Sequence, residues 1–228
     1  MNKVLLFDIE SSPNLAYVWG KYQQDVIEFQ SEWEMLSFSA KWLNGKSITL
    51  GRDTHSEKQL VTELHKLFNE ADIIIGHNGD KFDIKKTNAK FLEFGLTPPS
   101  PYKTIDTLKI ARRYFAFNSN RLGDLGQKLG LGKKVHTGGF QLWQGCMKND
   151  PKSWYLMKKY NKQDVVLLEK IYLKFLPWIQ NHPALEQGSG CPNCTSTNLQ
   201  KRGYAVTRKH KYQRYQCQDC SAWSQVRL

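Results

Sequence analysis

The sequence predicts an α/β protein in which a mixed sheet is flanked by helices and a small second domain follows. Short apolar runs typical of strands come first, and segments of helical periodicity then alternate with them, an order that favours one sheet covered by helices. About 180 residues suffice for such a core, whereas a final segment of about forty residues is too short to fold well without a metal. We therefore expect two domains, over residues 1–182 and 188–228.

Strands are expected near 3–9, 15–20, 36–43 and 47–51, then a helix near 57–70, a strand at 73–76 and mostly helix thereafter. A long helix is predicted late in this domain from residues that recur at spacings of three and four: Tyr160, Asp164, Leu167, Leu168, Ile171, Phe175 and Ile179. Proline and glycine between Pro177 and Gly190 then predict a short flexible linker.

Two acidic residues end the first predicted strand, which begins with the apolar run Val4 to Phe7. Side chains alternate between the faces of a strand, so Asp8 and Glu10 share a face. Burying two carboxylates at the end of an apolar strand is costly unless a charge offsets them, and a divalent cation would do so. The alternative is a strand end that emerges into solvent, and this motif alone does not decide between the two.

A second polar group follows the run of isoleucines at 73–75. The segment from Asn78 to Asp83 leads into a predicted helix, which places Asp83 near the helix start. Asn, Asp and Gly are also common before helices for backbone reasons, so ordinary capping is the alternative. A further acid, Asp106, precedes another helical segment, and we interpret it as a helix cap and not as a metal ligand.

Tyr160 and Asp164 are polar positions in the long helical pattern. Because they are four residues apart, they lie one turn apart on one face, which is otherwise apolar. A carboxylate on such a face is unexpected unless it is paired or bound to a metal. The alternative is an aspartate near a helix end that faces water.

In this order, the motifs Asp8-Ile9-Glu10, Asn78 with Phe82-Asp83, and Tyr160 with Asp164 resemble those of the DnaQ-like 3′-to-5′ exonucleases. The subgroup is the DEDDy type, whose last motif reads Tyr-x-x-x-Asp. The resemblance covers about four fifths of the chain and implies the RNase H-like fold there.

The resemblance also implies the catalytic residues. Two Mg²⁺ or Mn²⁺ ions, which prefer oxygen ligands, would be bound by Asp8, Glu10, Asp83 and Asp164. In relatives the tyrosine orients or helps to deprotonate the attacking water, and the asparagine lies near the nucleic-acid strand. These roles would fall to Tyr160 and Asn78. Since tyrosine has an ordinary pKa near 10, positioning is the expected role of Tyr160.

The predicted function is therefore hydrolysis of phosphodiester bonds from 3′ ends, with DNA preferred over RNA on the resemblance alone. An RNA exonuclease, or a structure-specific nuclease acting on branched or hybrid duplexes, is an open alternative, because the metals contact the phosphate and not the 2′-hydroxyl. A non-catalytic nucleic-acid-binding module, or a subunit that recruits a replication or repair protein, is an alternative of another class.

Two Cys-x-x-Cys pairs lie near the end of the chain, Cys191 with Cys194 and Cys217 with Cys220. This spacing predicts one structural Zn²⁺ held by four cysteines in a zinc ribbon, with strands near 203–207 and 212–216. Two disulfides are the alternative, but no signal peptide and no cysteine-rich scaffold are recognised. The remaining Cys146 is expected to be a buried or incidental thiol.

The predicted ribbon is strongly basic, with Asp219 as its acid, and aromatic residues are interleaved with the cations. This mixture suits phosphate contacts combined with base stacking. The expected nucleic-acid contacts are Lys201, Arg202, Arg208, Lys209, Lys211, Arg214 and Tyr215. The alternatives are that the aromatic residues form the core of the ribbon, and that the ribbon binds a protein.

The whole chain is basic as well: 33 Lys and Arg against 21 Asp and Glu give a formal net charge of +12, which is common among proteins that bind polyanions. No run of 18 apolar residues occurs, so no membrane span is expected. A cytoplasmic location in a bacterium, an archaeon or a virus-infected cell is expected. Lys133, Lys134 and His136 are expected to form a solvated loop, with a mobile basic lip over the substrate as the alternative.

Overall fold

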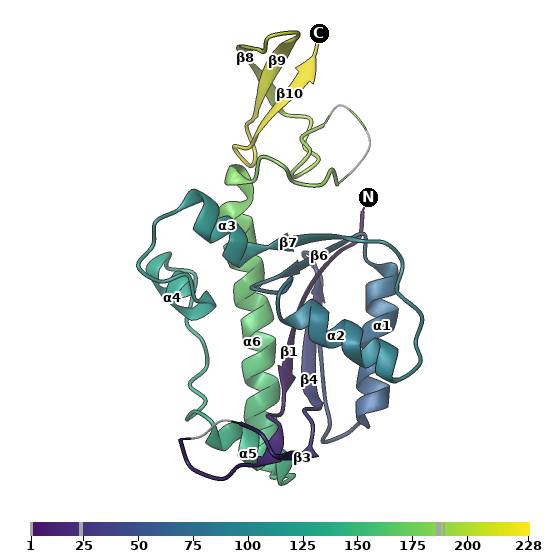
Figure 1. The fold of residues 1–228 in the computed structure, drawn as a ribbon. Coiled ribbons are helices and arrows are strands. Elements are labelled where there is room, and N and C mark those ends of the chain that lie inside the picture. Colours follow the sequence, from purple (N-terminus) through teal and green to yellow (C-terminus); the bar gives the residue numbers. More distant parts are fainter. Residues whose placement is uncertain (1, 23–24, 186–187, 189) are drawn as a thin grey trace.

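The computed structural model describes residues 2–22, 25–185, 188 and 190–228. A five-stranded sheet with the order β5-β4-β1-β6-β7 organises the N-terminal part of the chain (Figure 1). Its strands are β1 (Val4–Ser11), β4 (Met35–Trp42), β5 (Ser47–Gly51), β6 (Ile73–Gly76) and β7 (Lys103–Asp106). The β1–β4 and β4–β5 pairs are antiparallel, whereas β1–β6 and β6–β7 are parallel. The prediction of a mixed sheet is confirmed.

The alternation of side chains along β1 separates two cores on opposite faces of the sheet. Leu5 and Phe7 pack with α1 (Glu57–Glu70) and α2 (Asp83–Glu93), whereas Val4 and Leu6 pack with α6 (Pro151–Phe175). Figure 1 shows α6 along one side of the sheet and α1 and α2 along the other. Strand periodicity therefore directs the next even-numbered side chains, Asp8 and Glu10, towards α6.

Three shorter helices, α3 (Thr107–Tyr114), α4 (Leu122–Lys128) and α5 (Gln141–Met147), lie between β7 and α6 in the chain. The predicted long helix ends earlier than its pattern suggested. It gives way at Leu176 to a 3₁₀ turn (Leu176–Trp178), because Pro177 has no N–H to continue the helix. None of the helices in the described ranges is both long and apolar enough to cross a membrane.

The strand predicted near 15–20 is shorter in the structure than predicted. It is β2 (Leu15–Tyr17), which pairs with β3 (Glu28–Ser31) in a separate two-stranded sheet. No strand was predicted at β3, because all four of its residues are exposed and give no apolar alternation.

The C-terminal segment forms a three-stranded antiparallel sheet of β8 (Leu199–Val206), β9 (Lys211–Cys217) and β10 (Trp223–Arg227), in the order β10-β9-β8. It lies beyond the C-terminal end of α6 (Figure 1). The buried Asn193 joins this segment to the turn that follows α6, because its Nδ2 donates to the carbonyls of Leu176 and Ile179 at 2.8 and 3.2 Å. Of the predicted linker, residues 186, 187 and 189 lie outside the described ranges.

Candidate carboxylate and cysteine metal sites

Three carboxylates meet between β1 and α6. Asp8, Glu10 and Asp164 each offer one oxygen, and these oxygens lie within 4.8 Å of one another. Asp164 is 2% exposed in the middle of α6, so the alternative of a helix-end aspartate facing water is wrong. Its Oδ1 is buried and has no hydrogen-bond partner within the described part of the chain. An unpartnered carboxylate oxygen beside two other acids has the donor chemistry that a divalent cation prefers.

Asp83 lies beside this group of three and not within it. Its Oδ1 accepts a hydrogen bond of 3.3 Å from the backbone N–H of Ile9, which lies between Asp8 and Glu10 on β1. The N-cap position of α2 is Phe82, and no side chain caps that helix, so capping does not account for Asp83. Its position next to β1 brings it near Asp8, and its charge raises the pKa of Asp8.

Burial raises the pKa of all four carboxyl groups. For Asp8 the burial effect is followed by repulsion from Asp83, Glu10 and Asp164. Burial raises the pKa of Glu10 to about 8 and that of Asp83 to about 6, and it also raises the pKa of Asp164. Four carboxylates can therefore ionise together at neutral pH only if positive charge is added. Divalent metal ions held by these oxygens would supply it, so the residues fit the predicted metals.

Lys134 supplies part of this positive charge. Its Nζ lies 2.5 Å from Asp164 Oδ2 and donates to the Tyr160 hydroxyl at 3.2 Å. The lysine lowers the pKa of Asp164, Asp8 and Glu10. The interpretation of this loop as merely solvated is therefore wrong for Lys134. The basic stretch was visible in the sequence, but no local pattern indicates which of its side chains turns inwards.

Tyr160 lies one turn before Asp164 on α6, as its spacing predicted. Its ring packs edge-on against Trp143, with 6.1 Å between the ring centroids. Burial, followed by the charges of Glu10 and Asp164, raises its pKa, so the phenol keeps its proton at neutral pH.

Asn161 is a site residue that the sequence analysis missed. It is fully buried, and its Nδ2 donates to Asp8 Oδ2 at 2.7 Å and to the Asp8 carbonyl at 3.3 Å. Its Oδ1 accepts a hydrogen bond from the Ser37 hydroxyl at 3.2 Å. The available signal was its spacing, three residues before Asp164 on the same face of α6.

Asn78 lies at the carboxyl end of β6 in a left-handed conformation, with φ of 67°. Its backbone N–H donates to Asp106 Oδ1 at 2.9 Å, and the same oxygen accepts from the N–H of Leu108, so the interpretation of Asp106 as a helix cap is confirmed. A cavity of about 530 Å³ adjoins this turn, with Asn78, Arg112, Arg121 and Lys134 in its lining. Lys134 lines this cavity and also contacts Asp164, so the cavity adjoins the carboxylate cluster at this lysine.

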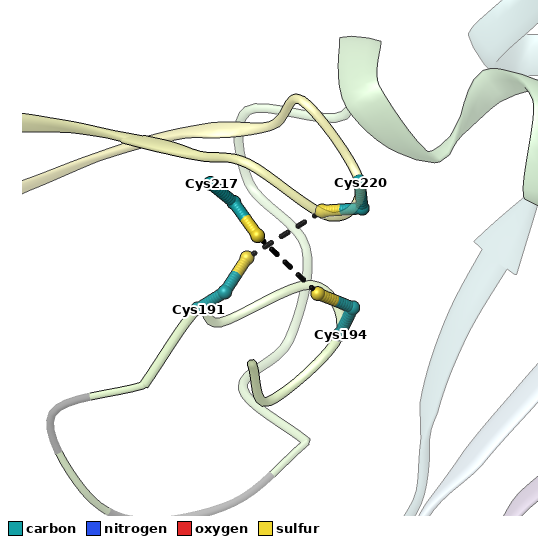
Figure 2. A group of neighbouring side chains, drawn as sticks. All are labelled: Cys191, Cys194, Cys217 and Cys220. Atoms are coloured by element: carbon teal, nitrogen blue, oxygen red, sulfur yellow. Dashed lines mark hydrogen bonds between the residues drawn. The ribbon is translucent and has the colours of Figure 1, made fainter. Parts of the chain in front are cut away.

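The four predicted zinc ligands form a second cluster. Their sulfur atoms lie within 4.8 Å of one another, and Figure 2 shows them converging from two turns of the chain. The Cys191–Cys220 and Cys194–Cys217 sulfurs are 3.6 Å apart, beyond the roughly 2.05 Å of a disulfide. Burial opposes ionisation of Cys217, but hydrogen bonds from the backbone N–H groups of Cys220 and Asp219 and from the thiols of Cys194 and Cys220 together lower its pKa to about 7. Four sulfurs at this separation suit one Zn²⁺.

The predicted ribbon contacts all lie away from the carboxylate cluster, on the sheet and turns of the C-terminal segment. Six are exposed and the seventh, Tyr215, is half-buried: Lys201, Arg202, Arg208, Lys209, Lys211, Arg214 and Tyr215. Cys146 is 1% exposed, as expected of a buried thiol, and burial raises its pKa to about 12.

Two known proteins are similar to part of this chain. The PolC-type DNA polymerase III of Ureaplasma parvum is 38% identical over 73 residues, which are 32% of this chain and 5% of the polymerase. Protein NEN3 of Arabidopsis thaliana is 29% identical over 84 residues, which are 36% of this chain and 16% of NEN3. The chain therefore spans only a small part of either relative.

A solved structure shares the fold. The family B DNA polymerase of the archaeon Pyrobaculum calidifontis superposes with a TM-score of 0.57 and 18% identity, over 78% of this chain and 25% of the polymerase. The family model of the RNase H superfamily matches residues 5–176, which contain all but the first residue of β1, the whole of α6 and all the clustered carboxylates. The chain therefore belongs to the RNase H superfamily.

Proposed function

We propose that the chain is a metal-dependent 3′-to-5′ exonuclease of the DEDDy type, with DNA as its preferred substrate. The observation that carries the proposal is the buried group of Asp8, Glu10 and Asp164, with Asp83 beside it. Its oxygens would hold two Mg²⁺ or Mn²⁺ ions, which would activate a water and stabilise charge on the scissile phosphate. The direction of cleavage and the preference for DNA come from the resemblance of the three motifs.

Tyr160 positions the attacking water in this proposal and does not deprotonate it, because burial keeps its proton in place. Lys134 donates to Tyr160 and to Asp164, so it fixes the phenol relative to the carboxylates. Its ammonium also presents a cation to an incoming phosphate at the edge of the adjoining cavity. Asn161 holds Asp8 in place, because its Nδ2 donates to Asp8 Oδ2.

The ribbon is proposed to hold one structural Zn²⁺ through its four cysteines and to bind the nucleic acid with its basic surface. A protein of replication or repair is the competing partner for that surface. Point variants distinguish these partners better than deletion of residues 188–228, because deletion would also remove Asn193 from the end of α6. Loss of binding to bare nucleic acid on neutralising ribbon cations supports the direct contact, and unchanged binding supports recruitment.

The test is digestion of 5′-labelled single-stranded DNA with Mg²⁺ or Mn²⁺, beside RNA and blunt duplex of equal length. A ladder that shortens from the 3′ end, and that Asp8→Ala and Asp164→Ala abolish, supports the proposal. Tyr160→Phe should slow cleavage without abolishing it. Internal cuts would instead indicate a structure-specific endonuclease, and the absence of metal-dependent cutting would favour a binding module.

A further inference from the structure

The register of the ribbon sheet sorts its side chains onto two faces. Residues directly opposite each other in antiparallel strands point to the same side. On one side β9 and β10 pair Gln216 with Trp223, Arg214 with Gln225, and Tyr212 with Arg227. We call these six residues the Trp223 face.

The opposite side of the same sheet faces inwards in part. It carries Gln213 and Cys217, which are both buried, and Leu199, which packs against the cysteine cluster. The side-chain amide of Gln213 holds it there, because its Nε2 donates to the Gly203 carbonyl at 2.8 Å. None of the six residues of the Trp223 face is buried, whereas the opposite side buries Gln213 and Cys217 and also carries the exposed Lys201 and Lys211.

The Trp223 face combines one exposed indole with two cations and no acid. Trp223 is 49% exposed, and Arg214, Gln225 and Arg227 are exposed further along the face. Arg214 Nη2 donates to the Tyr204 carbonyl at 2.6 Å, which leaves its other N–H groups for a phosphate. The acid of the ribbon, Asp219, is engaged elsewhere, because it accepts hydrogen bonds from Ser196 and Asn198. The face is thus complementary in charge to a polyanion and offers an aromatic surface at one end, at Trp223.

These groups fit single-stranded nucleic acid better than a duplex or a protein. An indole on a sheet can stack only on a base whose face is free, and the bases of a duplex stack on one another. Guanidinium groups on the neighbouring positions can contact phosphates. A protein-docking surface would instead present a contiguous apolar patch, whereas four of these six residues are Arg or Gln.

We propose that the Trp223 face binds single-stranded nucleic acid, with a base stacked on Trp223 and phosphates contacted by Arg214 and Arg227. This rests on the proposed function insofar as that function gives the chain a nucleic-acid substrate. The end of α6, where the ribbon docks, is eleven residues beyond Asp164, or roughly 16 Å at 1.5 Å per residue. The face would therefore hold part of the strand away from the 3′ end.

The test measures binding by the full chain in an Asp8→Ala background, which prevents cleavage. The probe is a fluorescein-labelled oligothymidylate of roughly 20 nucleotides, longer than the 4–16 of a typical single-stranded site. Trp223→Ala is compared with Trp223→Phe, which keeps an aromatic ring, and with Val226→Ala. Val226 is a matched control because it is 58% exposed on the same strand but points to the opposite face.

Trp223→Ala should raise the Kd roughly 5- to 150-fold, the equivalent of about 1–3 kcal/mol per stacked base. Trp223→Phe should retain most of the affinity, Val226→Ala should match the parent, and binding of duplex should change little. An unchanged Kd for Trp223→Ala, or an equal loss for Val226→Ala, would overturn the proposal.

A second variant distinguishes the loss of a nucleic-acid contact from misfolding of the ribbon. Arg214→Ala with Arg227→Ala, two exposed positions, should reduce the slope of log K against log salt by about 1.4, at 0.7 per lost phosphate contact on a single strand. Zinc content checks that each variant keeps its ribbon. If the chain with Asp8 intact cuts DNA but these binding results are not obtained, only this inference is refuted. If binding behaves as expected but no substrate is cut, only the proposed nuclease activity is refuted.

Discussion

Asn161→Ala removes the side chain that holds Asp8 in place. The amide donates to Asp8 Oδ2 at 2.7 Å, accepts from Ser37, and is fully buried, so water cannot replace it without opening the core. A hydrogen bond to a charged group contributes about 1.5–3 kcal/mol. Its loss should raise the pKa of Asp8 further and weaken its hold on a metal ion.

The expected change is a rise in the half-saturating Mg²⁺ concentration by roughly 12- to 160-fold, if the 1.5–3 kcal/mol falls wholly on metal binding. This agrees with the roughly 10- to 100-fold loss of metal affinity seen when partners of metal ligands are removed. The maximal rate should recover largely at high Mg²⁺, because all four carboxylates remain.

The assay is the initial rate of cleavage of 5′-labelled single-stranded DNA over a Mg²⁺ titration. Gln163→Ala is the control, since it removes an amide from a half-exposed position on the same helix. The reasoning would be refuted by an unchanged half-saturating concentration in Asn161→Ala, or by a rate that added Mg²⁺ does not restore.

Three further predictions concern charge and metal. Lys134→Met should move the acid limb of the pH–rate profile to higher pH, because Lys134 lowers the pKa of the clustered carboxyls; an unshifted limb would contradict this. Without added Mg²⁺ or Mn²⁺, stability should fall as pH rises. The raised pKa of Glu10, from 4.5 to about 8, contributes stability that is complete below pH 4.5 and lost as pH passes through 8. Thermal melts across this range test it, and Mn²⁺ should counter the loss at high pH. Cys194→Ser should release the zinc, whereas Cys146→Ser should retain one Zn²⁺ per chain, as metal analysis of the purified variants would measure.

Much of the fold could be predicted because it depends on local patterns. The apolar runs of β1, β4 and β6 and the helix at α1 lie within one or two residues of their predicted bounds. The strands β3 and β10 were not predicted, because their residues are largely exposed and show no apolar alternation. They become strands through pairing with β2 and β9, and pairing is not visible in either segment alone.

The features of the candidate site that depend on local patterns could also be predicted. The period of two along a strand put Asp8 and Glu10 on one face of β1. The period of 3.6 along a helix put Tyr160 and Asp164 on one face of α6, so the directions of these side chains could be predicted. The four cysteines were equally local, because two short turns suffice to present each pair. The structure brings one oxygen each of Asp8, Glu10 and Asp164 within 4.8 Å of one another, and their binding of a shared metal stays a prediction.

The sequence by itself therefore determined the α/β class, the acids that share a face and the cysteine pairs that share a turn. Only the tertiary structure decided that Lys134 reaches Asp164 across 30 positions of the chain, that Asn161 holds Asp8 across 153, and that Asn193 fastens the ribbon to α6. The physical reason is that periodicity fixes the direction of a side chain from its own element, whereas a hydrogen-bond partner distant in sequence is chosen by how the elements pack.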